Sequence, residues 1–240
     1  MDGRQMNNRI QRKVSSLPKQ LLGLLLSLLA SAVVTSLNGA EADPSPADPS
    51  SGQADPFALK QKGIWEGAVG QGFRSDLQTL SLQSGAVAGL AIFGSRQEHD
   101  LTLLSLSYGH MLGGVVGKDH WYRGNWELRG EFFGGAQVSP SRDWLVGLAP
   151  HLRYNFATGT RWIPYIDAGA GVSATGIGHP DLSGTFEFNL QANTGVHWFL
   201  RDNFALTFEG GYLHLSCAGI NSPNLGLNGV KAMVGATWFF

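Results

Sequence analysis

Apolar and polar residues alternate with a period of two through most of the chain from Trp65 to the C-terminus. Between 142 and 156 the odd positions include the polar residues His151, Arg153 and Asn155. The even positions of the same stretch are bulky and mostly apolar: Trp144, Val146, Leu148, Pro150, Leu152, Tyr154 and Phe156. The stretches 123–137 and 184–199 alternate in the same way, and the i, i+3, i+4 pattern of a helix is absent. The pattern therefore predicts an all-β domain.

The alternating stretches are long for a soluble sandwich and suit a membrane-spanning barrel. Several run for 11 to 16 residues, with aromatic residues near their ends and Gly, Asn, Gln, Glu or Arg on the second face. Strands of this length with one apolar and one polar face are typical of transmembrane barrels, in which the apolar side chains face lipid. We therefore expect an antiparallel transmembrane β-barrel of the outer-membrane type over residues 64–240.

Nine stretches are candidate strands: 64–73, 85–93, 100–110, 123–137, 142–156, 162–175, 184–199, 203–216 and 228–240. Bacterial single-chain barrels contain even numbers of strands. We expect an eight-stranded barrel, because the first two candidates are short and Gly-rich. The Ser, Gln and Leu residues between them can form a bulged continuation or a periplasmic hairpin.

A barrel of eight strands has an interior that side chains fill. The inward-facing Glu, Arg, Asn and Gln residues should form a packed network of hydrogen bonds. Lys231 and Glu209 share the inward parity on adjacent strands, and we expect them to form an ion pair inside the barrel. General diffusion is therefore not the expected function, and a small channel is a weaker alternative.

The first 42 residues have the pattern of a secretory signal peptide. Five basic residues precede an uncharged run of 14 residues, 21–34, which is shorter than the roughly 18 to 20 residues of a spanning helix. Ala40 and Ala42 offer a small-x-small cleavage site, so we expect export and removal of 1–42, with an uncleaved anchor as the alternative. Residues 43–63 are rich in Pro, Ser and Asp and predict a disordered linker, whose alternative is a binding peptide.

Composition narrows the function classes. The 240 residues carry a formal net charge of −1, which argues against nucleic acid because phosphates require a concentrated basic surface. One cysteine, Cys217, can form neither a disulfide framework nor a Cys-based zinc cluster. His99, His110 and His120 lie in or near one predicted connection, 110–122, where histidines without suitably spaced carboxylates are usually solvated. We therefore expect no metal and no cofactor.

The stretch 203–216 carries the residues most suited to catalysis. Its even positions are bulky and apolar, so parity places His214 and Ser216 on the lipid-facing wall, where polar side chains are costly and usually functional. Two residues apart on one face, they can act as a base and a hydroxyl nucleophile. Asn228 begins the next strand on the same face, whereas Cys217 has the opposite parity. The alternative interpretation is an ordinary polar pair at the membrane interface.

The segment containing His214, Ser216, Ala218, Gly219, Pro223, Asn224 and Gly226 resembles the outer-membrane lipid A 3-O-deacylases, also described as acyloxyacyl-hydrolase-like. The resemblance is good over 123–240, includes the aromatic C-terminus, and is loose for the earlier strands. It implies an eight-stranded barrel whose active site looks outward. It also implies Ser216 as nucleophile, His214 as general base, and Asn224 with the Gly219 N–H as candidates to hold the oxyanion.

Two residues depart from the family pattern. The family has a Glu where Asn228 stands, completing a Ser-His-Glu triad, and an Asn where Cys217 stands. Asn228 can still accept a hydrogen bond from the His ring and orient it, but it brings no charge to stabilise the imidazolium.

The sequence therefore predicts an outer-membrane serine esterase that hydrolyses an acyl ester of lipid A, most suitably the 3-O-linked hydroxyacyl chain. Expected partners are lipid A or lipopolysaccharide and, through the terminal Phe240, the barrel-assembly machinery of a Gram-negative-type outer membrane. The alternative from a different class is a non-catalytic barrel with a structural or binding role.

Overall fold

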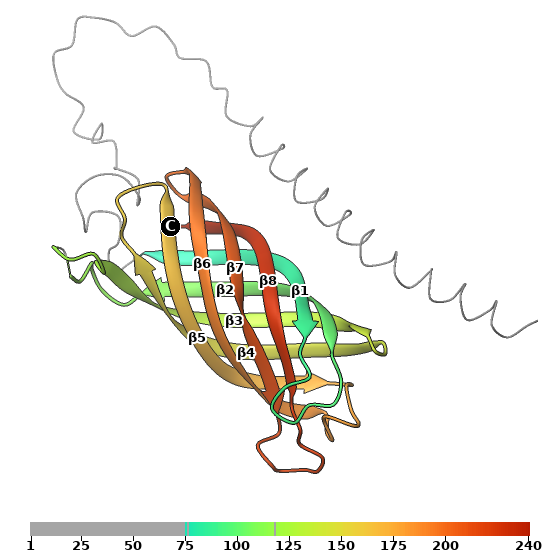
Figure 1. Ribbon diagram of the computed structural model, residues 1–240. Helices are drawn as coiled ribbons and strands as arrows, with labels where there is room; N and C mark the ends of the chain where they lie inside the picture. The colour runs from blue at the N-terminus through green and yellow to red at the C-terminus, as the bar shows by residue number, and fades with distance from the viewer. Residues whose placement is uncertain (1–74, 76, 118) are drawn as a thin grey trace, which may run out of the picture. The chain divides into compact units, whose positions relative to one another are not determined.

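The computed structural model describes residues 75, 77–117 and 119–240. The predicted signal peptide, the predicted linker and the first candidate strand, 64–73, lie outside the described residues. Within them, eight strands form one closed antiparallel barrel in which each strand pairs with its neighbours in sequence and β1 pairs with β8 (Figure 1). The predicted fold class and strand number are therefore confirmed.

The strand bounds follow the alternating stretches closely after the first strand. The strands are β1 (Gln78–Gly89), β2 (Asp100–Met111), β3 (Gly124–Ser139), β4 (Asp143–Phe156), β5 (Trp162–Thr175), β6 (Phe186–Arg201), β7 (Phe204–Ser216) and β8 (Leu227–Phe239). Because neighbouring strands are antiparallel, alternate connections lie at the same end. Residues 90–99, 140–142, 176–185 and 217–226 form what we call the loop end, and the opposite end, with 112–123 and Phe240, is the terminal end.

The first strand differs from the prediction. The Ser, Gln and Leu residues expected to form a bulge or a hairpin are instead the first half of β1, and 90–93 belong to the following loop. In that first half, Leu80 pairs with Trp238 and Leu82 with Ala236, so this segment closes the barrel against β8. The alternation weakens in the second half of β1, where the small residues Ser84 and Ala86 occupy the outward positions.

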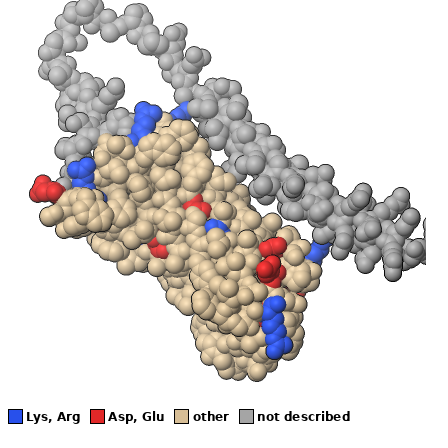
Figure 2. All heavy atoms as spheres, in the orientation of Figure 1, with Lys and Arg blue, Asp and Glu red and all other residues tan. Residues whose placement is uncertain are grey.

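The two faces of the barrel wall differ as the alternation predicts. On β2, for example, the exposed Leu104, Leu106 and Tyr108 alternate with buried Ser105 and Ser107. Few charged side chains interrupt the wall on the face shown in Figure 2. Exposed apolar area of this extent is unfavourable in water and suits contact with lipid. Helices long and apolar enough to cross a membrane are absent from the part of the chain that the structure describes.

Charged side chains fill the middle of the barrel. Asp167 lies 3.1 Å from Arg129 and 3.2 Å from Arg153, and Arg153 lies 3.2 Å from Glu209. The predicted pair of Lys231 and Glu209 forms, with 3.1 Å between Nζ and Oε1. Each of these five charges therefore has a partner of opposite sign, which buried ions need.

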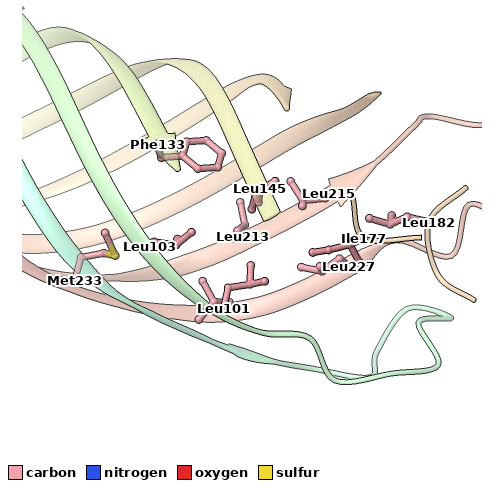
Figure 3. Close-up of a cluster of buried hydrophobic side chains, with 11 residues drawn as sticks. Leu101, Leu103, Phe133, Leu145, Ile177, Leu182, Leu213, Leu215, Leu227 and Met233 are labelled. Atoms are coloured by element: carbon pink, nitrogen blue, oxygen red, sulfur yellow. The ribbon is translucent and has the colours of Figure 1, made fainter. Parts of the chain in front are cut away.

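An apolar cluster closes the interior at the loop end (Figure 3). Leu213 and Leu215 of β7 and Leu227 of β8 contribute to it, together with Ile177 and Leu182 from the β5–β6 connection. All five side chains are at most 3% exposed. The cluster fixes the inner sides of the two strands whose outer sides carry His214, Ser216 and Asn228.

The three histidines expected near one connection lie at different ends. His99 ends the 90–99 connection at the loop end, whereas His120 lies in 112–123 at the terminal end and stacks on Tyr122. The prediction was wrong for His99 because β2 crosses the barrel between His99 and the 112–123 connection, which places them at opposite ends. No group of three His, Cys, Asp or Glu side chains among the described residues could hold a metal ion.

Candidate active site

The last residues of strand β7 include His214 and Ser216, whose side chains lie on the outer wall of the barrel. Both are half-buried, whereas the intervening Leu215 points inward and is fully buried in the apolar cluster. Successive side chains of a strand point to opposite faces, so the inward anchoring of Leu215 fixes the outward direction of its two neighbours. The structure thus gives both polar residues the face that parity predicts.

Asn228 lies directly across from His214 in the β7–β8 pairing. Its side-chain oxygen is 2.8 Å from Nδ1 of His214. Unlike His214, Asn228 is almost completely buried, at 1% exposure. The expected neighbourhood of His214 and Asn228 is therefore present, with the amide held away from solvent.

A backbone carbonyl from another part of the chain orients the Asn228 amide. The Nδ2 group of Asn228 donates a 3.0 Å hydrogen bond to the carbonyl oxygen of Ile92, in the connection between β1 and β2. A carbonyl oxygen can only accept, so the NH₂ group must face Ile92 and the amide oxygen must face His214. That oxygen can in turn only accept, which places a proton on Nδ1 of His214 and leaves Nε2 free to accept one.

Tyr212 is a site residue that the sequence reasoning missed. Its hydroxyl donates a second hydrogen bond to the side-chain oxygen of Asn228, from two positions before His214 on the same face. The amide oxygen thus has two donors, the Tyr212 hydroxyl and the His214 ring. The outward parity shared by Tyr212, His214 and Ser216 was the available signal.

Ser216 and His214 do not form a hydrogen bond with each other in this structure. The two Cα atoms are about 6.6 Å apart along the strand, and among the described residues the ring of His214 is bonded to Asn228 alone. On the neighbouring strand β6, Phe188 pairs with Ser216. The ring of Phe188 contacts that of Phe186, with 5.2 Å between the ring centroids. Catalytic hydrogen bonds commonly tighten only when substrate is bound.

The 217–226 connection wraps around the end of β7. The side-chain oxygen of Asn224 accepts a 2.9 Å hydrogen bond from the N–H of Cys217, which places the Asn224 amide beside the Ser216 backbone. Ala218 and Gly219 both have left-handed backbone angles, with φ of 52° and 81°, and are exposed. The Cys217 side chain is buried, away from the outward face of Ser216. The structure therefore brings Asn224 close to the backbone of Ser216, whereas Gly219 is exposed on the surface of the connection.

Gly226 allows the loop to pack closely against the histidine. Its φ is +81°, a conformation that favours glycine, and a Cβ built there would lie 2.8 Å from Cε1 of His214. Any larger residue would displace the ring. The 217–226 connection thus packs against the ring of His214 and also contains Asn224.

Comparisons with known proteins identify a family and similar folds. A family model described as lipid A 3-O-deacylase (PagL) matches residues 102–237. Among solved structures, the outer membrane enzyme PagL has a TM-score of 0.50 at 20% identity, over 65% of this chain and 97% of that chain. Neisserial surface protein A has a TM-score of 0.48 at 16% identity, over 68% and 97%. A comparison with curated protein sequences gave no match.

The family match begins in β2 and ends in β8, so it includes every strand that carries His214, Ser216 and Asn228. Because it spans more than half of the 240 residues, the chain belongs to the PagL family of lipid A 3-O-deacylases.

Proposed function

We propose that this protein is an outer-membrane serine esterase that removes the 3-O-linked hydroxyacyl chain of lipid A. The observation that carries the proposal is the 2.8 Å contact between His214 Nδ1 and the Asn228 oxygen on the outer wall of the barrel. Together with the Ile92 carbonyl, this contact prepares Nε2 of His214 to accept a proton. A base oriented by a third residue beside a serine is the pattern of an activated nucleophile.

The proposed reaction has two steps. In the first, Ser216 Oγ attacks the ester carbonyl carbon while its proton passes to Nε2 of His214. The tetrahedral oxyanion would be held by the Gly219 N–H and the Asn224 side-chain NH₂, and its collapse breaks the bond to the sugar oxygen, which takes the proton from His214. In the second, water activated by His214 hydrolyses the acyl-Ser216 ester and releases the fatty acid.

The surroundings of Ser216 suit an acyl ester already in the membrane. Phe188 and Leu190 of β6 and Val230 of β8 are exposed on the same wall, beside Ser216, His214 and Asn228. Acyl chains lying against these side chains would present the ester near the nucleophile without a deep pocket. The family description supports lipid A as the glycolipid.

The presence of Asn228 in place of a carboxylate bears on the rate of the chemical step. An amide fixes the tautomer and direction of His214, but it does not add the negative charge that stabilises an imidazolium in Ser-His-Asp and Ser-His-Glu triads. We therefore propose a working enzyme whose chemical step is slower than that of a carboxylate triad.

The same proposal includes the site of action. A signal peptide over 1–42 would export the chain, and the exposed Phe240 at the terminal end would serve recognition by the barrel-assembly machinery. The apolar outer wall is compatible with residence in the outer membrane, where lipid A is found.

The test is mass spectrometry of lipid A from cells that express the wild type, Ser216→Ala or His214→Ala. Heat-modifiability on gels checks that each barrel folds. Ser84→Ala is the matched control, because Ser84 also lies on the outward face but on β1, opposite Val234 and away from the site. We expect loss of one hydroxyacyl chain with the wild type and Ser84→Ala, and no loss with the other two.

Fragmentation of the product assigns the position of the lost chain. Loss from a position other than 3-O would overturn the regiochemistry and keep the esterase. If Ser216→Ala folds and remains active, Ser216 is not the nucleophile. Inactivity of a folded wild type would favour the alternative, a non-catalytic barrel.

A further inference from the structure

Asp181 lies in the β5–β6 connection, outside the residues assigned to catalysis, and is completely buried. Its carboxylate accepts hydrogen bonds from the N–H groups of Arg96 and Gln97, at 2.7 and 2.9 Å, and lies 2.9 Å from Nε2 of His99. All three partners belong to the 90–99 connection. One carboxylate therefore holds the second half of that connection.

The 90–99 connection is the segment that orients Asn228. The Ile92 carbonyl accepts from the Asn228 amide at 3.0 Å and also from the Ser95 N–H at 3.1 Å. Ser95 precedes the two N–H groups that Asp181 binds, and its hydroxyl lies 3.4 Å from the same carboxylate. A short chain of contacts thus runs from Asp181 through Ser95 and Ile92 to Asn228.

Phe93 in this connection has an unfavourable backbone conformation. Its φ is +55°, in the left-handed region, and its side chain is 84% exposed. A bulky non-glycine residue in that region persists only where surrounding contacts enforce it. The exposed Phe93 ring makes little contact, so the hydrogen bonds on either side, at Ile92 and at Arg96, must supply the constraint.

Asp181 also binds the connection on the other side of the site. Its main-chain carbonyl accepts hydrogen bonds from the N–H groups of Leu225 and Gly226, at 2.9 and 3.2 Å. Leu225 follows Asn224, and Gly226 packs against the ring of His214. The side chain and the main chain of one residue therefore bind the two segments that contact Asn228 and His214.

Two further contacts anchor Asp181 itself. The second ring nitrogen of His99 lies 3.1 Å from Gln137, which donates to Ser141 in the β3–β4 turn. The next residue, Leu182, is fully buried in the apolar cluster beside Leu227 (Figure 3). Leu182 thus fixes Asp181 to the cluster independently of the two segments it binds, and His99 connects the carboxylate to the barrel wall.

From these contacts we infer that Asp181 is a positioning residue for the catalytic triad. It holds Ile92, which orients Asn228, and it holds Gly226, which limits the movement of His214. The inference rests on the proposed function and names the element that aligns its site. Because positioning residues act through the reacting groups, loss of Asp181 should lower kcat more than it changes KM.

The test compares purified Asp181→Asn with the wild type in mixed micelles containing lipid A. Asparagine has nearly the same shape but lacks the charge and one acceptor oxygen. We expect kcat to fall about tenfold with KM within about twofold of the wild type. Glu187→Gln is the matched control, because Glu187 is a fully buried carboxylate at the same end whose oxygens have no hydrogen-bond partner among the described residues. It should leave both constants unchanged.

A double variant separates positioning from a general structural effect. If Asp181 acts in part through Asn228, then Asp181→Asn should lower kcat by a smaller factor in the Asn228→Ala background than in the wild type. Two losses that multiply would overturn the inference, and so would an unchanged kcat in Asp181→Asn. If Asp181→Asn does not fold, His99→Gln removes the ring that binds the carboxylate and should lower kcat in the same direction.

Amide hydrogen exchange provides a readout that does not depend on activity. Asp181→Asn removes only the side-chain contacts, so it should increase exchange in 90–99 and leave the 112–123 connection at the wild-type rate. Unchanged exchange in 90–99 would overturn the inference. If the wild type itself removes no acyl chain, the proposed function fails, and the exchange result alone decides whether the Asp181 carboxylate holds 90–99.

Discussion

Asn228 and His214 face each other across the β7–β8 pair, with 2.8 Å between the amide oxygen and Nδ1 of the ring. The direction of that amide is decided by Ile92, which is 136 residues away in sequence. The contact becomes possible because β8 pairs with β1 and closes the barrel, which brings the 90–99 connection next to the start of β8. Barrel closure therefore contributes directly to the geometry of the proposed triad.

Removal of the Tyr212 hydroxyl should slow the reaction without unfolding the barrel. Tyr212→Phe deletes one of two donors to the Asn228 oxygen and keeps the ring. A hydrogen bond of this kind contributes about 1 kcal/mol, so kcat should fall roughly fivefold. Tyr108→Phe is the control, since it removes a hydroxyl bonded to Gln78 at the terminal end. Equal steady-state rates for the two variants would show that Tyr212 does not support Asn228.

A methyl group at Gly226 should displace the catalytic histidine. In Gly226→Ala the new Cβ would lie 2.8 Å from the His214 ring, and the positive φ adds backbone strain. We expect kcat to fall by at least an order of magnitude. Gly159→Ala is the control: Gly159 has a similar φ of +75° but lies in a turn at the terminal end, where a new Cβ would be 3.8 Å from Nη2 of Arg123. If both variants deacylate lipid A at the wild-type rate, His214 does not depend on the close packing at Gly226.

Stability should depend strongly on Asp167 in the barrel interior. Asp167 lies within 3.2 Å of Arg129 and Arg153 and 2.7 Å from Nδ1 of His151. Asp167→Ala leaves two buried guanidinium groups short of negative charge, which should lower the free energy of unfolding by about 3 kcal/mol or more. Urea titration in lipid vesicles measures the change. Asp202→Ala, at an exposed turn, should change it by less than about 0.5 kcal/mol, and equal effects would contradict the prediction.

The hydrogen bonds of Asp181 predict a pH dependence at the loop end. Burial raises the pKa of this carboxyl, but the N–H of Arg96, the ring of His99 and the N–H of Gln97 outweigh burial, and the pKa is lowered overall. A lowered pKa stabilises the folded state above the ordinary aspartate pKa of about 3.9, and the stabilisation is lost as pH falls through the lower folded value. The loop end should therefore stay closed from neutral pH down to about 4 and loosen below it.

Pepsin cleavage between pH 4.5 and about 2.5 can follow this opening. Cleavage in 90–99, normalised to an unfolded peptide substrate, should increase as the pH falls in the wild type. In Asp181→Asn the normalised rate should be higher at the start and depend little on pH. A wild-type profile identical to that of the variant would rule out Asp181 as the group responsible.

Strong alternation made most strands predictable. The stretch 162–175 has the same bounds as β5, and 203–216 differs from β7 by one residue. In such strands an apolar outward face and a polar inward face each fix the parity. In β1 the outward Ser84 and Ala86 are small and the parity signal is weak. Pairing with β8 and β2 sets its register instead.

Parity also located part of the candidate site, since His214, Ser216 and Asn228 share one face of adjacent strands. The same argument could have included Tyr212. It could not have found Ile92 or Asp181, because both reach the site from connections, where no periodic pattern exists. The hydrogen bonds of His99 were equally hidden, since its partners Asp181 and Gln137 are 82 and 38 residues away.

The sequence by itself determined the class of fold, the faces of the strongly alternating strands and the residue types available for acyl transfer, because these follow from a local period of two and from side-chain chemistry. The tertiary structure decided how those residues are oriented. Only the closed barrel brings Ile92 to Asn228, and Asp181 to Leu225 and Gly226. The NH₂ group of Asn228 must therefore face the Ile92 carbonyl, and its side-chain oxygen must face His214. A hydrogen-bond direction depends on all the groups that surround it, and those groups come together only when the chain is folded.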